Sequence, residues 1–155
     1  MLQIEPKSRV REDRAPKAPL ETMQDREEVG QEVASDLTLG GLGTFLSAGS
    51  KGVNLLAANL GLTAVIPVRI VTDPEGLKLR LKADDAKALA DAGGVVAFLL
   101  GERDERDRYY LPVDKFLAKA TLRDGRYVLD FNEKWLLPYL GHPGVKKAFA
   151  RLLKK

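Results

Sequence analysis

Apolar and polar residues alternate most clearly over residues 64–83, AVIPVRIVTDPEGLKLRLKA. The alternation has a period of two on both sides of Asp73-Pro74-Glu75-Gly76, whose composition is typical of a turn. This pattern predicts a β-hairpin. Pairing its halves across the turn places on the inner face the pairs Thr72–Leu77, Ile70–Leu79 and Val68–Leu81.

The opposite face of the predicted hairpin is cationic. In the same register Arg69 meets Arg80 and Pro67 meets Lys82, while Lys78 lies on the same face. Cations that lie directly opposite each other normally destabilise a sheet. We therefore expect this face to bind an anionic partner.

Shorter patterns predict the other elements. Ser50 can cap an apolar helix that runs to about Leu60 and ends at Gly61, and a second helix runs from Asp84 to Gly93-Gly94. Later elements are a buried middle strand at residues 95–100, a return strand at 108–111, a short helix from Asp114, a turn at Asp124-Gly125 that pairs Leu122 with Tyr127, a helix capped by Asn132 and an amphipathic helix over residues 144–155. This order predicts an α/β (α+β) fold with a mixed central β-sheet flanked by helices.

Composition divides the chain into an arm and a body. Residues 1–36 are predicted to form a charged, largely flexible arm, because residues 1–19 contain prolines and few large apolar side chains; residues 20–34 could form a short helix. Residues 37–155 are expected to form a single α/β domain. Residues 37–68 carry only one charge but lack an uninterrupted apolar run of about 20 residues, so no membrane partner is expected.

Charge is segregated along the chain. The net charge is +3, of which residues 1–19 contribute +2 and residues 20–36 contribute −5, which leaves +6 for residues 37–155. A basic body favours an anionic partner. The acidic segment is expected either to cover the basic face or to bind another protein chain. The C-terminal cations could extend a contact with nucleic acid, or could simply suit the dipole of a solvated helix.

Residue usage adds two expectations about origin. The chain has no cysteine, which excludes disulfides and thiolate metal sites and is typical of cytoplasmic proteins. Asn and Gln are scarce while Leu, Ala, Arg and Glu are abundant, a bias found in thermophiles that GC-rich coding also produces.

Motifs for catalysis are incomplete. Gly41-Leu42-Gly43 lacks the third glycine of a dinucleotide loop, and Gly49-Ser50-Lys51 lacks the residue order of a P-loop. His142 is the single histidine, so one chain cannot build a two-histidine metal site or a His-dependent triad. The acids at Asp84-Asp85 and in residues 102–107 are explained by a helix start and a solvated turn. The sequence predicts no catalytic residue, no metal site, no cofactor and no enzymatic activity.

Aromatic residues offer a further route to nucleic acid, because they can stack on bases. Their alternating positions predict that most of them lie in the core, with one or two exposed. The candidates are Tyr109, Tyr110, Tyr127, Phe131 and Trp135.

The order of the elements resembles the restriction-endonuclease-like, Holliday-junction-resolvase-like PD-(D/E)XK superfamily. A leading helix, a hairpin ending in xxK, a short helix, an apolar strand and a strand ending in Tyr-Leu-Pro occupy about residues 50–113. The resemblance places Arg80-Leu81-Lys82 where the family has (E/Q)xK, so Lys82 matches the catalytic lysine. Arg80 replaces the acid, and Arg69 or a neighbour replaces the first metal-binding Asp. Because cations in those places would repel a metal, the resemblance implies a relative that keeps the scaffold without cleavage.

Two functions remain. The first is a non-catalytic nucleic-acid-binding or nucleic-acid-machinery protein, whose phosphate contacts would be Arg69, Lys78, Arg80, Lys82, Lys146, Lys147 and Arg151. The second is a protein-interaction or structural module, such as a regulatory subunit or a viral accessory or coat-associated protein, that docks through residues 1–36. A basic face exposed to solvent would favour the first function, and a face covered by residues 20–36 or by another chain would favour the second.

Overall fold

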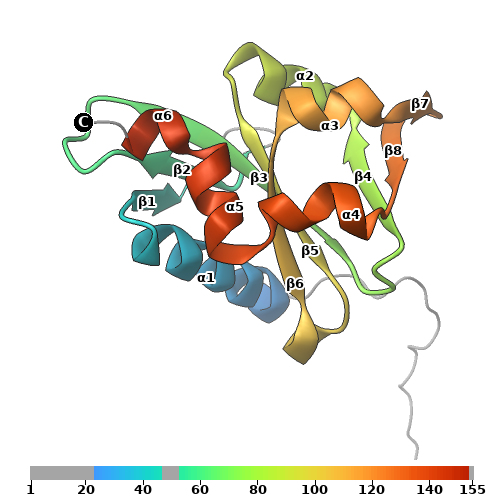
Figure 1. The fold of residues 1–155 in the computed structure, drawn as a ribbon, viewed down its shortest axis with the longest axis horizontal. Coiled ribbons are helices and arrows are strands. Elements are labelled where there is room, and N and C mark those ends of the chain that lie inside the picture. Colours follow the sequence, from blue (N-terminus) through green and yellow to red (C-terminus); the bar gives the residue numbers. More distant parts are fainter. Residues whose placement is uncertain (1–22, 47–52, 154–155) are drawn as a thin grey trace, which may run out of the picture.

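The computed structural model describes residues 23–46 and 53–153 and has a mixed α/β fold with two sheets (Figure 1). The large sheet has the strand order β1-β2-β3-β5-β6, with β1 (Gly43–Leu46), β2 (Leu55–Ala58), β3 (Val65–Asp73), β5 (Val95–Leu100) and β6 (Asp107–Pro112). The small sheet has the order β4-β8-β7, with β4 (Lys78–Lys82), β8 (Arg126–Asp130) and β7 (Thr121–Arg123). The helices are α1 (Met23–Leu39), α2 (Ala83–Asp91), α3 (Val113–Lys119), α4 (Glu133–Leu136), α5 (Gly141–Ala148) and α6 (Ala150–Leu153), with the 3-10 turns η2 (Arg103–Glu105) and η3 (Leu137–Tyr139).

The large sheet separates two hydrophobic clusters. On one face, side chains of the sheet pack against α1, α5 and α6, where Val33, Val145 and Phe149 are fully buried. On the other face, the sheet packs against the small sheet, α2, α3 and α4, around Phe98 and Phe116. Strand β5 is buried along its whole length because it pairs with β3 and β6 and is covered on both faces, as the run VVAFLL predicts.

The predicted hairpin of residues 64–83 is wrong in its pairing. The turn forms, with the Gly76 amide donating to the Asp73 carbonyl at 3.0 Å, but β3 and β4 belong to different sheets. Strand β5 pairs with residues 68–73 of β3, the half next to the turn, and β2 pairs with residues 65–68. Pairing of β4 with β8 instead lets its apolar side chains join the cluster around Phe98 and Phe116. This pairing buries Leu79 and Leu81, whereas Leu77, predicted to point inward, is 60% exposed.

The predicted helix from Ser50 to Leu60 is also wrong in its described part. Residues 55–58 form β2, and the preceding strand β1 was not predicted. A short run that is apolar on all sides suits a buried strand as well as a buried helix, so periodicity does not separate them. Ser50 itself lies outside the described residues.

Most of the other local predictions are confirmed. Helix α2 begins one residue before Asp84, and the amides of Gly93 and Gly94 bond to the carbonyls of Ala90 and Leu89 at its end. Leu122 pairs with Tyr127 across the turn at residues 124–125, and Asn132 caps α4. The predicted C-terminal helix is divided at Phe149 into α5 and α6.

Helix α1 crosses the predicted boundary between arm and body at residue 36. Val29, Val33 and Leu37 recur at four-residue intervals, and all three belong to the core. Residues 1–22 lie outside the described part, so the expectation for residues 1–19 falls there. In the described part of the chain, no helix combines the length and the apolar character that crossing a membrane would require.

Candidate nucleic-acid interface

The outer face of the small sheet gathers five cations from three strands. Residues that lie directly opposite each other share a face, and two such rows run from β4 through β8 to β7. One row is Lys82–Arg126–Arg123 and the other is Arg80–Val128–Thr121, while Lys78 lies opposite Asp130. We call Lys78, Arg80, Lys82, Arg123 and Arg126 the cationic sheet face.

The opposite side of the small sheet fixes this orientation. Leu79 and Leu81 on β4 are buried, and Tyr127 and Leu129 on β8 pack against the same cluster. Because strand side chains alternate with a period of two, burial of these residues directs the cations to solvent. Arg80, Lys82 and Arg126 are exposed and form no ion pair within residues 23–46 and 53–153.

A single carboxylate interrupts the cationic sheet face. Lys78 Nζ donates to Asp130 Oδ1 at 2.5 Å, and this hydrogen bond lowers the pKa of Asp130 below its ordinary value. Both side chains are exposed, so the pair contributes little to stability. This pair lies at one end of the cationic sheet face, and Lys82, Arg126 and Arg123 are three adjacent cations at the other end.

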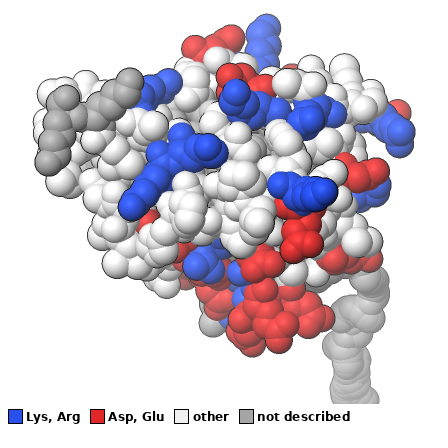
Figure 2. Space-filling view, viewed as in Figure 1, with Lys and Arg blue, Asp and Glu red and all other residues white. Residues whose placement is uncertain are grey.

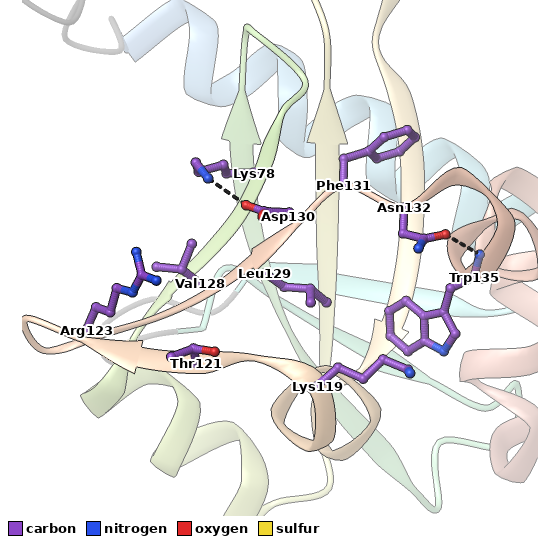
Figure 3. Close-up of a pocket in the computed structure, with 10 residues that line it drawn as sticks. All are labelled: Lys78, Lys119, Thr121, Arg123, Val128, Leu129, Asp130, Phe131, Asn132 and Trp135. Carbon is purple, nitrogen blue, oxygen red and sulfur yellow. Dashed lines mark hydrogen bonds and ion pairs between the residues drawn. The ribbon is translucent and has the colours of Figure 1, made fainter.

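A hollow of about 490 Å³ lies beside these residues (Figure 3). It is lined by cations, polar groups and aromatic rings: Lys78, Lys119, Thr121, Arg123, Val128, Leu129, Asp130, Phe131, Asn132 and Trp135. Trp135 is held at the first turn of α4, where its amide donates to Asn132 Oδ1 at 3.1 Å. Lys119 Nζ lies 5.2 Å from the centre of the Trp135 ring, within the range of a cation–π interaction.

The predicted cation Arg69 is not part of this surface. It lies on β3 in the large sheet, and its Nε is 3.5 Å from Asp85 Oδ2 on α2, with the Asp85 side chain largely buried. Arg69 and Arg80 therefore do not face each other, which corrects the predicted pairing of like charges. Asp85 thus pairs with a cation here.

The C-terminal cations occupy α5 and α6. Lys146, Lys147 and Arg151 are exposed, and Lys147 Nζ lies 6.0 Å from the centre of the Tyr139 ring. Tyr139 in turn lies 6.0 Å from Trp135, measured between ring centres. The structure thus connects Lys147 to the hollow through two aromatic rings. Figure 2 shows cations over the upper part of this side of the molecule, whereas acidic residues gather below, near the turn between β5 and β6.

The acidic segment does not cover the cationic sheet face in the described part of the chain. Glu28, Glu32 and Asp36 form one stripe along α1 and pair with arginines of η2, of the residue before β6 and of β6 itself. Arg103 binds Glu28 through two hydrogen bonds of 2.8 and 2.7 Å, and Arg106 donates to Glu32 at 2.7 Å. Three of the four acids in residues 27–36 thus pair with these arginines. For residues 27–36, cover of the basic face, one of the two predicted alternatives, is therefore wrong.

Asp36 anchors the inner end of this stripe. It is 5% exposed and accepts hydrogen bonds from Arg108 Nε and from the Tyr110 hydroxyl, both at 2.5 Å. Burial, and then the hydrogen bond to Asp36, raise the pKa of Tyr110 far above its ordinary value. Hydrogen bonding to Asp36 likewise raises the pKa of Arg108. The segment therefore ties α1 to the large sheet.

The residues present do not fit the divalent metal that the family resemblance implies. Within the described residues, no group of three or more Asp, Glu, His or Cys side chains is arranged to hold a metal ion. The triplet Arg80-Leu81-Lys82 lies on the small sheet, where two of its three side chains are exposed cations.

Sequence reasoning missed Arg123 and Arg126 as members of the cationic sheet face. Both flank the predicted turn at residues 124–125, so their mutual pairing follows from the sequence. Their proximity to Lys82 does not, because it depends on the long-range pairing of β4 with β8.

Comparison with known proteins supports the fold. No family model matches the sequence, and no curated protein matches it. Among solved structures the chain is similar to Hjc, a Holliday junction resolvase from the archaeal hyperthermophile Archaeoglobus fulgidus. The match has a TM-score of 0.56 and 19% identity, and it covers 77% of this chain and 93% of the resolvase chain. The chain therefore has the fold of this resolvase, as the family resemblance predicted, although residues 55–58 of the expected leading helix form β2.

Proposed function

We propose that the protein binds nucleic acid through phosphate contacts on the cationic sheet face and does not cleave it. The observation that carries the proposal is the row Lys82–Arg126–Arg123. Three adjacent cations repel one another, and the closely spaced phosphates of a nucleic acid would neutralise them while releasing condensed counterions. Such contacts position a protein on the backbone and carry no sequence information.

Two further observations support this function. The acidic residues 27–36 pair with arginines near β6, which leaves the cationic sheet face uncovered by that segment. In addition, the fold is that of a resolvase, a protein that acts on DNA junctions. Because a fold hosts many functions, the proposal depends on the row of cations, and the fold adds to it by analogy.

Salt-dependent binding tests the phosphate contacts. In Arg80→Gln/Lys82→Gln, the loss of two contacts should reduce the slope of log affinity against log salt by roughly 1.8 for duplex DNA, since each contact contributes about 0.9. Both side chains are exposed, so the melting temperature should hardly change. Anisotropy of labelled duplex and single-stranded DNA across a salt series measures the slope.

The matched control is Lys87→Gln/Lys115→Gln, which removes the same charge from exposed positions on α2 and α3. Its salt slope should stay near that of the parent. An equal loss in both double variants would mean that net charge alone drives binding, and an unchanged slope in the first would remove the cationic sheet face from the proposal.

Absence of cleavage needs a separate test. The full chain is incubated with junction, linear and single-stranded DNA in Mg²⁺ or Mn²⁺, and we expect the substrates to stay intact. The expectation follows from the lack of a metal-holding cluster among the described residues. Metal-dependent cleavage that disappears in Lys82→Ala would contradict it.

A further inference from the structure

We propose that Trp135 and Tyr139 form a stacking platform for unpaired bases, so that the ligand of this surface is single-stranded nucleic acid. The inference rests on the proposed function and names the form of its ligand. It starts from the hollow, because phosphate binding alone needs only exposed cations. A volume of about 490 Å³ lies within the range of roughly 300–1,000 Å³ that is typical of sites for organic molecules.

The two rings lie in one continuous series of cations and aromatics. Lys119 Nζ is 5.2 Å from the centre of Trp135, Trp135 is 6.0 Å from Tyr139, and Tyr139 is 6.0 Å from Lys147 Nζ. Both rings are half-buried and pack against the core, so they are anchored while part of each surface stays accessible. The series runs from the hollow beside the small sheet towards α5.

This arrangement suits a single strand chemically. Bases stack on aromatic rings without regard to sequence, while basic residues follow the backbone. Lys119 is exposed, and its ammonium group lies over the face of the Trp135 ring. A base can displace the ammonium group from the ring and stack there, and the ammonium group can then bind a phosphate. Arg123 and Lys78 line the far side of the hollow, and Asn132 and Thr121 supply polar groups for a base edge (Figure 3).

A duplex uses less of this surface. Its bases are paired and stacked on one another, so their ring faces cannot reach Trp135 without unstacking, which costs a few kcal/mol. Unpaired bases can stack on the rings at no such cost. The hollow therefore distinguishes single-stranded from duplex nucleic acid, whereas the cationic sheet face recognises only the charge of the backbone.

The fluorescence of Trp135 gives a direct readout, because the chain contains one tryptophan. Titration of the full chain with oligothymidine of about 12 nucleotides should change the Trp135 emission, whereas a duplex of the same length should bind without a comparable change. An unchanged emission at saturating oligothymidine would overturn the inference. A mononucleotide that binds as tightly as the oligonucleotide would overturn the single strand as the ligand.

Variants measured with labelled oligothymidine provide the second readout. Trp135→Leu should weaken binding by about 5- to 150-fold, the loss of one stacked base, while Trp135→Phe should restore much of it. Binding to duplex should stay near that of the parent in both. The control is Leu137→Ala, which changes an exposed apolar residue on η3 that lies between Trp135 and Tyr139 in the sequence and should not change affinity.

The outcomes separate this inference from the proposed function. Salt-dependent binding of both DNA forms that is insensitive to Trp135→Leu would overturn the stacking platform and retain the phosphate-binding face. Failure of the parent to bind either form would overturn both. If Trp135→Leu melts below the assay temperature, the emission of the parent and the affinity of Trp135→Phe still decide the matter.

Discussion

Replacing Asp36 with Asn should destabilise the protein more than most single substitutions. The carboxylate accepts from Arg108 Nε at 2.5 Å, from Arg108 Nη2 at 3.2 Å and from the Tyr110 hydroxyl at 2.5 Å. Asn keeps the volume but removes the charge and one of the acceptor oxygens. The substitution therefore leaves the half-buried Arg108 without its nearest counter-charge and disrupts the tie between α1 and β6.

The magnitude follows from burial. Removing one member of a buried ion pair costs about 3–5 kcal/mol. The Arg108 side chain is 33% exposed and has Glu32 at 3.8 Å, so water and that second carboxylate recover part of the loss. We expect a decrease in the free energy of unfolding of about 2–3 kcal/mol, a large share of the roughly 5–15 kcal/mol of a typical domain.

Urea unfolding followed by circular dichroism measures the change. Glu27→Gln is the matched control, because Glu27 is exposed on the same helix, and it should shift stability by no more than about 0.5 kcal/mol. In a double-mutant cycle, Tyr110→Phe should cost less in the Asp36→Asn background than alone, with a coupling energy of about 0.5–3 kcal/mol. A loss below about 1 kcal/mol, or additive effects of the two substitutions, would refute the view that Asp36 anchors α1.

Substitutions at three other positions test separate features. The hydrogen bond from Arg103 is the largest cause of the lowered pKa of Glu28. The stability that this pairing contributes is therefore present above the ordinary pKa of 4.5 and is lost as pH falls through the lowered pKa. Between about pH 6 and pH 3, Glu28→Gln should lose less stability than the parent does, as measured by urea midpoints. Asp73→Ala should cost about 2–3 kcal/mol in urea unfolding, since the Asp73 carboxylate accepts from the amides of Leu77 and Lys78 at 3.1 and 2.8 Å, and Asp73→Asn, which keeps one acceptor, should cost less. Gly144→Ala should lower the melting temperature strongly, because the new Cβ would overlap the carbonyl of Tyr139. The expected decrease in the free energy of unfolding is at least about 3 kcal/mol, and a melt like that of the parent would contradict this packing.

The sequence by itself determined many of the local elements, with β1 and β2 as exceptions, and the direction of many side chains. The run VVAFLL predicts β5 because a strand covered on both faces has no polar side. The alternation in β4 predicts that Leu79 and Leu81 are buried and that Arg80 and Lys82 are exposed, since a period of two assigns faces whatever the partner strand. Caps and turns are equally local, which is why Asn132 and the turn at residues 124–125 were predictable.

Only the tertiary structure decided which strand edges meet. A turn between β3 and β4 favours a hairpin, but β3 pairs with β5 and β4 pairs with β8, and nothing local in the sequence records that competition. The same long-range pairing placed Arg126 and Arg123 beside Lys82 and separated Arg69 from Arg80. The sequence therefore determined that the candidate site is basic. Its shape, its hollow and its aromatic border were decided by contacts between residues far apart in the chain, whose formation depends on the packing of the whole domain.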